Sequence, residues 1–192
     1  MAGTTQPIKN RMDVERLKDY YRSVKPNARN YALIVLGLNS ALRISDILSL
    51  KWKDMYDFSA MCFLERVEVV EKKTGKKQSI PLNANVREAM EALFREQEDK
   101  QAEGWIFTGW QGRPISRVQA FRIVSQAAQE LSLGKHISCH SLRKTFGYHA
   151  YQMGVSPSLL MELYNHSSYQ VTKRYLGLNQ DEKDEVYLKI NL

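Results

Sequence analysis

The segment LYNHSSYQVTKRYLGL, residues 163–178, places a histidine nine positions before a tyrosine in a largely polar stretch. Asn165 suits the end of one helix, and Ser168 is a suitable N-cap for a short second helix. The second helix would carry Tyr175 in its last turn and end at the following glycine. A tyrosine in that place is either a packing residue or a nucleophile with His166 beside it, and the rest of the chain must decide.

Two further helices are predicted just before this segment. An apolar stripe indicates a helix that begins near His140 and ends at Gly154; the stripe is Leu142, Phe146, Ala150 and Met153. Ser156 followed by Pro157 is a typical N-cap and first helical residue, so a new helix starts there. Its buried face is expected to be Leu159, Leu160 and Leu163.

Three helices are predicted in the first fifty residues. The first follows Asp13, with apolar residues at Val14, Leu17 and Tyr21. Residues 27–42, NARNYALIVLGLNSAL, contain an apolar run long enough for a buried helix. The third helix has apolar residues at Ile44, Ile47, Leu48 and Leu50. Ser45 is its expected N-cap, which places Arg43 just before the helix start.

The middle of the chain predicts a β-hairpin with a basic tip. Residues 61–70, MCFLERVEVV, are rich in strand formers, KKTGKK supplies a turn, and QSIPL is a second strand. Helical spacing returns in residues 83–97, and residues 116–132 predict another helix. The predicted fold class is therefore α+β and mainly helical, with a small antiparallel sheet near the lysine hairpin.

Composition limits the class of protein. The chain has 192 residues, enough for one sizeable core, and a net charge of +7 with a pI near 9.4, which favours a polyanionic partner. Cys62 and Cys139 are the two cysteines, and their spacing supports neither a disulfide framework nor a metal site. No signal peptide or membrane span is predicted, so we expect a cytoplasmic protein.

The strongest candidate for anion binding is the pair His140 and Arg143 in HSLR, at the expected helix start. Arginine offers bidentate hydrogen bonds to phosphate oxygens, and imidazole can transfer a proton near neutral pH. An H-x-x-R pair is more often an ordinary surface pair, and the same holds for Arg43, for a lysine in the turn and for His166 taken singly. None of these residues identifies a function alone.

Taken in order, these residues resemble the catalytic domain of the tyrosine recombinases, the phage integrase family. The resemblance covers nearly the whole chain and involves ALRISDILSLKWKDM, KKTGKKQSIPL, HSLRKTF and LYNHSSYQVTKRYLGL. It implies these catalytic residues: Arg43, Lys73, His140, Arg143, His166 and Tyr175. Lys73 is chosen because it directly precedes Thr-Gly, although Lys72 and Lys76 are close.

The resemblance implies a site-specific recombinase or integrase that cleaves and rejoins DNA through a 3'-phosphotyrosyl intermediate. Tyr175 would attack the phosphodiester, and the ester bond would be kept for rejoining, so neither a cofactor nor a metal is expected. His140 would help to remove the tyrosine proton, and Lys73 would protonate the leaving 5'-oxygen. Arg43, Arg143 and His166 would hold the non-bridging oxygens.

Members of the family usually carry a DNA-binding domain before this region, and Arg43 stands too early for one. We therefore expect a single catalytic domain over residues 1–192 without the N-terminal core-binding domain, either a naturally short protein or a piece of a longer one. Binding should then be weak and salt-dependent. Asn165 stands where the family has glycine, and Asp46 where it has glutamate; both are mild departures.

The expected partner is double-stranded DNA, bound by a homo-tetramer and with an accessory DNA-binding protein as a further candidate. Candidate DNA contacts are Lys72, Lys76, Arg113, Arg117, Arg122 and Lys144, although solvated surface explains them almost as well. Alternation over residues 186–192 predicts a C-terminal strand that joins the hairpin sheet in cis or in a partner. The alternatives are an inactive DNA-binding or regulatory relative and a type IB topoisomerase-like enzyme.

Overall fold

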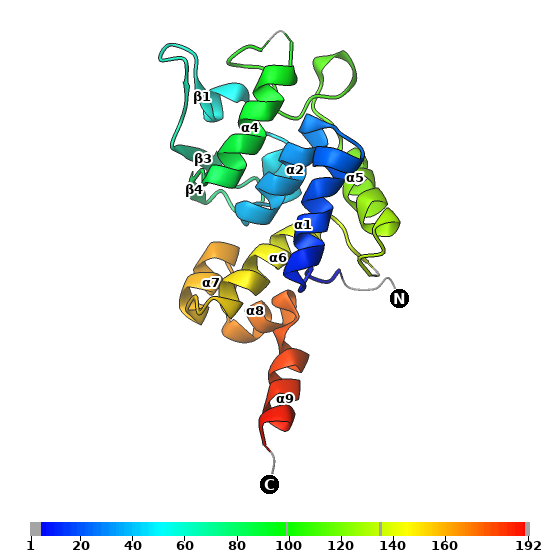
Figure 1. Ribbon diagram of the computed structural model, residues 1–192. Helices are drawn as coiled ribbons and strands as arrows, with labels where there is room; N and C mark the ends of the chain where they lie inside the picture. Colours follow the sequence, from blue (N-terminus) through cyan, green and yellow to red (C-terminus); the bar gives the residue numbers. More distant parts are fainter. Residues whose placement is uncertain (1–4, 99, 135, 191–192) are drawn as a thin grey trace.

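The computed structural model describes residues 5–98, 100–134 and 136–190 (Figure 1). Its first half contains α1 (Arg11–Asp19), a π-helical turn η1 (Tyr20–Val24), α2 (Ala28–Asn39), α3 (Ile44–Ile47), η2 (Trp52–Asp54), β1 (Tyr56–Asp57), β2 (Cys62–Phe63), β3 (Arg66–Val70), β4 (Lys77–Pro81) and α4 (Ala84–Glu96). The remainder contains η3 (Trp110–Gly112), α5 (Arg117–Glu130), α6 (Cys139–Gln152), α7 (Pro157–Tyr164), α8 (Tyr169–Leu176) and α9 (Leu178–Lys189). The prediction of a mainly helical α+β fold is confirmed.

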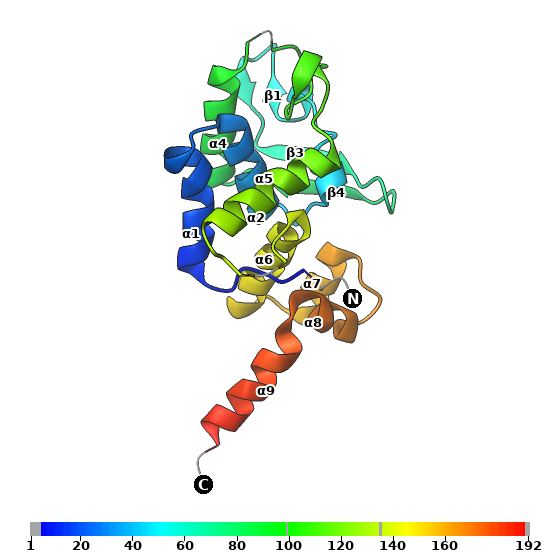
Figure 2. The ribbon, with the colours of Figure 1, turned by 90° about the vertical axis from the view of Figure 1, so that its right-hand side faces the viewer.

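Helix α2 forms the centre of the main core. Nearly all of its residues are buried, including Leu33 and Ile34, because the run 27–42 is apolar on every face. It packs against α1, α4 and α6, so it is covered from several sides (Figures 1 and 2). Asn27 caps it by accepting a hydrogen bond from the backbone of Asn30. The predicted buried helix is confirmed.

The first and third predicted helices differ from the structure in their caps. Helix α1 starts at Arg11 with Asn10 as its N-cap, and the π-helical turn continues it. Helix α3 starts at Ile44, so its N-cap residue is Arg43 and the expectation that Ser45 caps it is wrong. Ser45 lies inside the first turn, where its hydroxyl hydrogen-bonds the neighbouring carboxylate of Asp46. Arg43 nevertheless stands at a helix start, as predicted.

The described residues form two small antiparallel sheets where the sequence predicted a single hairpin. The apolar run at 61–70 is split between β2, which pairs with β1, and β3, which pairs with β4. In the second sheet Val67 lies opposite Ile80, and Val67 and Val69 face the main core. The hairpin β3–β4 thus packs one face of a two-stranded ribbon on the helices and carries the lysine turn at its end.

The caps predicted in the last third are confirmed. Ser156 and Ser168 accept hydrogen bonds from the third residues of α7 and α8, and Pro157 is the first residue of α7. A second, smaller core holds these helices against α6; its buried residues are Ala41, Leu160, Tyr164, Leu176 and Leu178. Two members of the predicted apolar faces are exposed instead, Met153 after the end of α6 and Leu159 on α7.

The C-terminal strand prediction is wrong. Residues 178–189 form α9, which points away from the rest of the molecule (Figures 1 and 2). Helix formation propagates along a chain, and the residues before Val186 are mostly helix formers, so four alternating residues do not override it. Ile190 follows in extended conformation, and the last two residues, 191–192, lie outside the described residues.

Candidate active site

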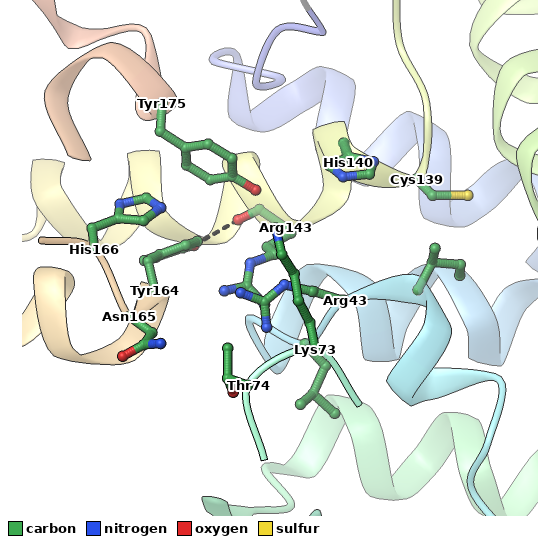
Figure 3. A pocket seen from close by; sticks show the side chains of 12 residues that line it. Arg43, Lys73, Thr74, Cys139, His140, Arg143, Tyr164, Asn165, His166 and Tyr175 are labelled. Carbon is green, nitrogen blue, oxygen red and sulfur yellow. Dashed lines mark hydrogen bonds between the residues drawn. The ribbon is translucent and has the colours of Figure 1, made fainter. Parts of the chain in front are cut away.

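One pocket of about 330 Å³ gathers all the predicted catalytic residues. Its lining is Leu42, Arg43, Ile44, Lys73, Thr74, Cys139, His140, Arg143, Tyr164, Asn165, His166 and Tyr175. These residues come from the start of α3, the β3–β4 turn, α6, the α7–α8 connection and α8. Figure 3 shows the side chains of Arg43, Lys73, Arg143, His166 and Tyr175 grouped around one common space, whereas the thiol of Cys139 points away from it. The structure therefore brings together groups that are up to 132 positions apart in the chain.

Arg43 is held by a carboxylate that sequence reasoning did not single out. Its Nη1 lies 2.5 Å from Oε2 of Glu71, which is fully buried, while the arginine side chain is 22% exposed. The same carboxylate accepts hydrogen bonds from Thr74 at 2.6 Å and from Gln78 at 2.8 Å. Because one edge of the guanidinium is fixed on Glu71, its orientation in the pocket is set by the hairpin.

The turn that carries Lys73 is tied to the protein at both ends. The backbone amide of Glu71 donates to the carbonyl of Lys76 at 2.9 Å, and that of Gly75 donates to the carbonyl of Glu71 at 2.8 Å. Asp46 on α3 accepts from the backbone amide of Lys72 at 3.0 Å. The exposed Lys73 therefore lies on a turn that hydrogen bonds hold to the rest of the protein, whereas the sequence indicated only a basic hairpin tip.

Arg143 lies on α6 and is 4% exposed. Its guanidinium carbon lies 4.8 Å from the ring centroid of Tyr164, a cation–π geometry. Within the described ranges its buried Nη1 has no hydrogen-bond partner. A guanidinium nitrogen without an acceptor, in the wall of a pocket, suits an anion that supplies the missing acceptor oxygen.

His140 precedes Arg143 on the first turn of α6 and is exposed to solvent. The pKa of His140 is lowered from its ordinary value of 6.5, first because surrounding protein atoms withdraw part of its hydration and then because Arg143, Lys144, Arg43 and Lys73 are positively charged. The imidazole is therefore neutral at pH 7 and able to accept a proton.

His166 follows the end of α7, where Asn165 adopts the left-handed conformation that closes the helix. Its Nδ1 is 3.1 Å from the hydroxyl of Thr172, a fully buried residue of α8. Desolvation and then the charges of Arg143 and Arg43 lower its pKa as well. With one ring nitrogen committed to Thr172, the opposite edge of the imidazole lines the pocket.

The ring of Tyr175 is surrounded by other aromatic and cationic groups. Its centroid lies 5.0 Å from that of His166 and 5.3 Å from that of Tyr164. Burial raises the pKa of Tyr175, and the nearby Arg143 and Arg43 offset only part of this rise. The phenol is therefore protonated at neutral pH, and a reaction at its oxygen needs a neighbouring proton acceptor.

Tyr164 and Gly147 support this arrangement, although no pattern in the sequence indicates their role. The hydroxyl of Tyr164 donates to the backbone carbonyl of Arg143 at 2.7 Å (dashed line in Figure 3). A Cβ at Gly147 would lie 2.5 Å from that hydroxyl and 2.6 Å from Leu176. Only glycine allows α6 to approach α7 and α8 this closely. In the sequence, Tyr164 looks like another apolar residue of α7. Its role comes from contacts that form only in the folded protein.

Lys144 differs from its predicted place. It is 4% exposed, its ammonium donates to the carbonyl of Thr5 at 2.6 Å, and it lies 5.0 Å above the ring centroid of Tyr175. Desolvation lowers its pKa. The side chain is therefore buried and not on the surface, and its contact with DNA stays a prediction. Through these contacts Lys144 links Thr5 of the N-terminal segment to the ring of Tyr175.

The other candidate DNA contacts lie outside the pocket. Arg113, Arg117 and Arg122 are exposed on η3 and α5, and Lys72 is exposed on the lysine turn. Lys76 is half-buried, and its ammonium is 3.3 Å from the carbonyl of Glu162 on α7. Their contact with DNA stays a prediction.

No group of three or more His, Cys, Asp or Glu side chains is placed to hold a metal ion within residues 5–98, 100–134 and 136–190. In the same ranges, none of the helices combines the length and apolar character needed to cross a bilayer. The free cysteine in the pocket wall, Cys139, has its pKa raised to about 12 by burial, so it is protonated at neutral pH.

Three relatives show what the chain is similar to in sequence. It is 36% identical over 183 residues to the probable integrase/recombinase YoeC of Bacillus subtilis (strain 168), an alignment that covers 95% of this chain and 94% of that protein. It is 31% identical over 155 residues to the type 1 fimbriae regulatory protein FimE of Escherichia coli (strain K12), covering 79% and 76%. It is 29% identical over 161 residues to the tyrosine recombinase XerC of Pelobacter propionicus, covering 84% and 51%.

Solved structures share the fold. The XerA recombinase superposes with a TM-score of 0.75 at 17% identity, covering 100% of this chain and 66% of that one. The XerH site-specific recombinase bound to palindromic difH substrate superposes with a TM-score of 0.73 at 21% identity, covering 97% and 53%. The chain thus spans about half the length of XerC and XerH, and its fold is that of a tyrosine recombinase catalytic domain.

A family model adds a match along most of the sequence. Residues 10–182 match the model of the phage integrase family, a range that includes every residue of the pocket. This match and the relative at 36% identity over almost its whole length agree with each other. The chain belongs to the phage integrase family, the family of the tyrosine recombinases.

Proposed function

We propose that this protein is a site-specific DNA recombinase or integrase that cleaves and rejoins DNA through a 3'-phosphotyrosyl intermediate. The observation that carries the proposal is the pocket itself. Its wall contains the phenol of Tyr175, the guanidinium of Arg43 held by Glu71, and the buried Nη1 of Arg143, which has no hydrogen-bond partner among the described residues. Two guanidinium groups and an adjacent hydroxyl are the groups that transfer of a phosphodiester requires.

In the proposed reaction the oxygen of Tyr175 attacks the phosphorus of one DNA strand. A bond forms between the phenolic oxygen and phosphorus, and the bond to the 5'-oxygen breaks. His140, neutral because of its lowered pKa, accepts the phenolic proton. Lys73 supplies a proton to the leaving 5'-oxygen. Arg43, Arg143 and His166 stabilise the negative charge on the non-bridging oxygens.

The same steps in reverse rejoin DNA. A free 5'-hydroxyl from another strand attacks the phosphotyrosyl ester, and Tyr175 leaves as the phenol. Each step exchanges one phosphoester for another, so the bond energy is retained and the chemistry consumes no external energy source. The direction of the exchange is then decided by which 5'-hydroxyl is aligned with the ester.

Double-stranded DNA is the proposed partner, and the net charge of +7 agrees with it. Arg113, Arg117 and Arg122, all exposed, are proposed backbone contacts together with Lys72 and Lys76. The proposed assembly on DNA is a homo-tetramer, with an accessory DNA-binding protein as a further candidate. Its support is α9, whose exposed residues include Val186, Tyr187 and Leu188, and the exposed Ile190 that follows it. A cytoplasmic location with access to the chromosome follows from this proposal.

The test is a nicked suicide substrate, which traps the covalent intermediate because the cleaved fragment diffuses away. The wild-type protein is expected to form a denaturation-resistant adduct with DNA, and Tyr175→Phe to form none. Tyr169→Phe, a change on the same helix α8, is the matched control and should keep the adduct.

The outcome separates the candidate functions. Absence of an adduct at every salt concentration, with DNA still bound, would support an inactive DNA-binding or regulatory relative. Relaxation of supercoils without sequence preference would support a topoisomerase-like enzyme. Strand exchange between two copies of one site would support the recombinase.

A further inference from the structure

Glu71 is a buried carboxylate that pairs with Arg43 beside the pocket. It directly follows β3, is fully buried, and accepts three side-chain hydrogen bonds. Its Oε2 accepts from Arg43 at 2.5 Å and from Thr74 at 2.6 Å, and its Oε1 accepts from Gln78 at 2.8 Å. One carboxylate thus joins the start of α3, the lysine turn and strand β4.

The backbone of the same residue closes the lysine turn. Its amide donates to the carbonyl of Lys76, and its carbonyl accepts from the amide of Gly75. Lys73 lies between these anchors and lines the pocket. Any displacement of Glu71 therefore moves Arg43 and Lys73 together, two of the groups that the proposed reaction uses.

The charge state of Glu71 is the second observation. Burial alone would raise its pKa, but the hydrogen bonds from Thr74 and Arg43 and the charges of Arg43 and Arg143 outweigh burial, so the pKa is lowered. The carboxylate is ionised at neutral pH. It therefore offsets the repulsion between two guanidinium groups that converge on one small space.

We propose that Glu71 is a positioning residue that presets Arg43 and the lysine turn for the transition state at the expense of ground-state affinity for DNA. This inference rests on the proposed function. A buried negative charge next to the phosphate seat weakens attraction for the phosphate, yet it fixes the geometry in which the arginine and the lysine act. Removing the charge should therefore slow the chemistry without weakening the binding of DNA.

The experiment compares Glu71→Gln with Glu68→Gln. Both changes remove one negative charge from the β3 region, but Glu68 is exposed on β3 and bonds Ser79 on β4, without contact to Arg43. For Glu71→Gln we expect single-turnover adduct formation to fall about tenfold or more, because a charge-assisted bond is lost. We expect its non-covalent Kd for the DNA site to stay equal or to improve a few-fold. For Glu68→Gln we expect the adduct rate to stay within about twofold.

Glu71→Asp separates charge from reach, since it keeps the carboxylate but shortens the side chain. It should slow adduct formation while leaving the Kd unchanged. Circular dichroism and Tm for each variant show whether it is folded at the assay temperature. If Glu71→Gln does not fold, Glu71→Asp with Thr74→Val decides the question. Adduct rates equal to wild type in folded variants, or rate and affinity falling together, would overturn the inference.

A wild-type protein that forms no adduct would refute the proposed function rather than this inference. The positioning role is then read from arginine side-chain NMR. The ion pair should restrict rotation of the Arg43 guanidinium in wild type and in Glu68→Gln, so its signals are resolved, and Glu71→Gln should lose that restriction. Equal guanidinium dynamics in all three proteins would contradict the role of Glu71.

Discussion

The two sides of the pocket hold their residues by different kinds of contact. On the side of α3 and the lysine turn, buried carboxylates do the holding: Glu71 binds Arg43, and Asp46 binds the backbone of Lys72. This side also packs on the large main core around α2. Ion pairs and backbone bonds of this kind fix a geometry before any substrate arrives.

On the side of α7 and α8, ring contacts and a small core do the holding. Tyr175 touches the rings of Tyr164 and His166, and the core behind it has five buried members among the residues that the structure describes. Gly177, in the left-handed conformation, ends α8. We infer that the anion-binding side is rigid and that the nucleophile side can adjust when DNA binds, because small cores open locally at lower cost.

Arg143 belongs to both sides, and its replacement should have the largest effect. Arg143→Lys keeps the charge but removes the planar guanidinium that packs on Tyr164 and lines the pocket in which the phosphate is proposed to bind. We expect single-turnover adduct formation to fall about 10²–10³-fold, the usual loss for one preorganised charge donor. Arg95→Lys, an exposed change on α4 outside the proposed DNA contacts, is the control and should stay near wild type. A loss below about fivefold would show that Arg143 does not hold the phosphate.

Two glycines on different sides give a packing test. Alanine at Gly147 would press on Tyr164 and Leu176, whereas alanine at Gly37 would mainly press on the flexible end of Leu142, at 2.7 Å. We expect Gly147→Ala to lower the free energy of unfolding by about 1–3 kcal/mol and to slow adduct formation, because the ring under Arg143 shifts. Gly37→Ala should change the adduct rate little. Thermal denaturation and single-turnover rates measure both; equal effects of the two changes would contradict the comparison.

The pH dependence tests the proposed base. His140 and His166 both have a folded-state pKa below 6.5, so each is neutral from neutral pH down to that value and becomes protonated only in more acidic solution. The second-order rate of adduct formation, which reports on the free enzyme, should be flat above pH 6.5 and fall about tenfold per unit at lower pH. His140→Gln should abolish the acid limb. A limb centred above 6.5 would contradict the base assignment.

The same shifts have a consequence for stability. Because both imidazoles bind a proton more weakly when folded than when unfolded, their contribution to stability is complete above pH 6.5 and is lost as the pH falls through their lowered pKa values. Urea denaturation at several pH values measures this directly.

The smallest expected effect concerns Thr172, which holds His166 on the nucleophile side. Thr172→Val keeps the shape and removes the hydroxyl, so the imidazole loses the bond that fixes its tautomer. We expect a fall of about three- to tenfold in adduct formation. Thr172→Ser should restore most of the rate. Nitrogen NMR of His166 would show a changed tautomer population in the valine variant; an unchanged population would remove this role.

Sequence patterns were sufficient for the parts of the site that depend on local order. N-caps at Ser156 and Ser168 define where α7 and α8 begin. Arg43 stands at the start of α3. These local positions could therefore be found without coordinates. The position of Glu71 could not. It stands beside Lys72 in a charged turn that looks solvated, and only tertiary packing buries it. Burial of a charge depends on its partners, which a sequence does not place.

The errors have a common physical origin. The alternation near Val186 covers few residues, and the helix that precedes it in the chain decides its conformation. Ser45 has a side chain suited to capping, but the hydrogen-bonding pattern starts the helix at Ile44, two residues earlier than a cap at Ser45 would. Lys144 carries a charge that usually indicates surface, yet the N-terminal segment covers it. In each case residues beyond the short pattern decide the structure: the preceding helix, the backbone hydrogen bonds of α3, or the N-terminal segment.

In the proposed reaction, Tyr175 attacks one phosphorus atom while groups on the opposite side of the pocket bind the non-bridging oxygens. The most direct measurement is to trap the adduct on a nicked substrate, digest the protein and locate the DNA-linked residue by mass spectrometry. We expect a single modified peptide, linked through the oxygen of Tyr175 to a 3'-phosphate. A link at any other residue, or a link to a 5'-phosphate, would contradict it.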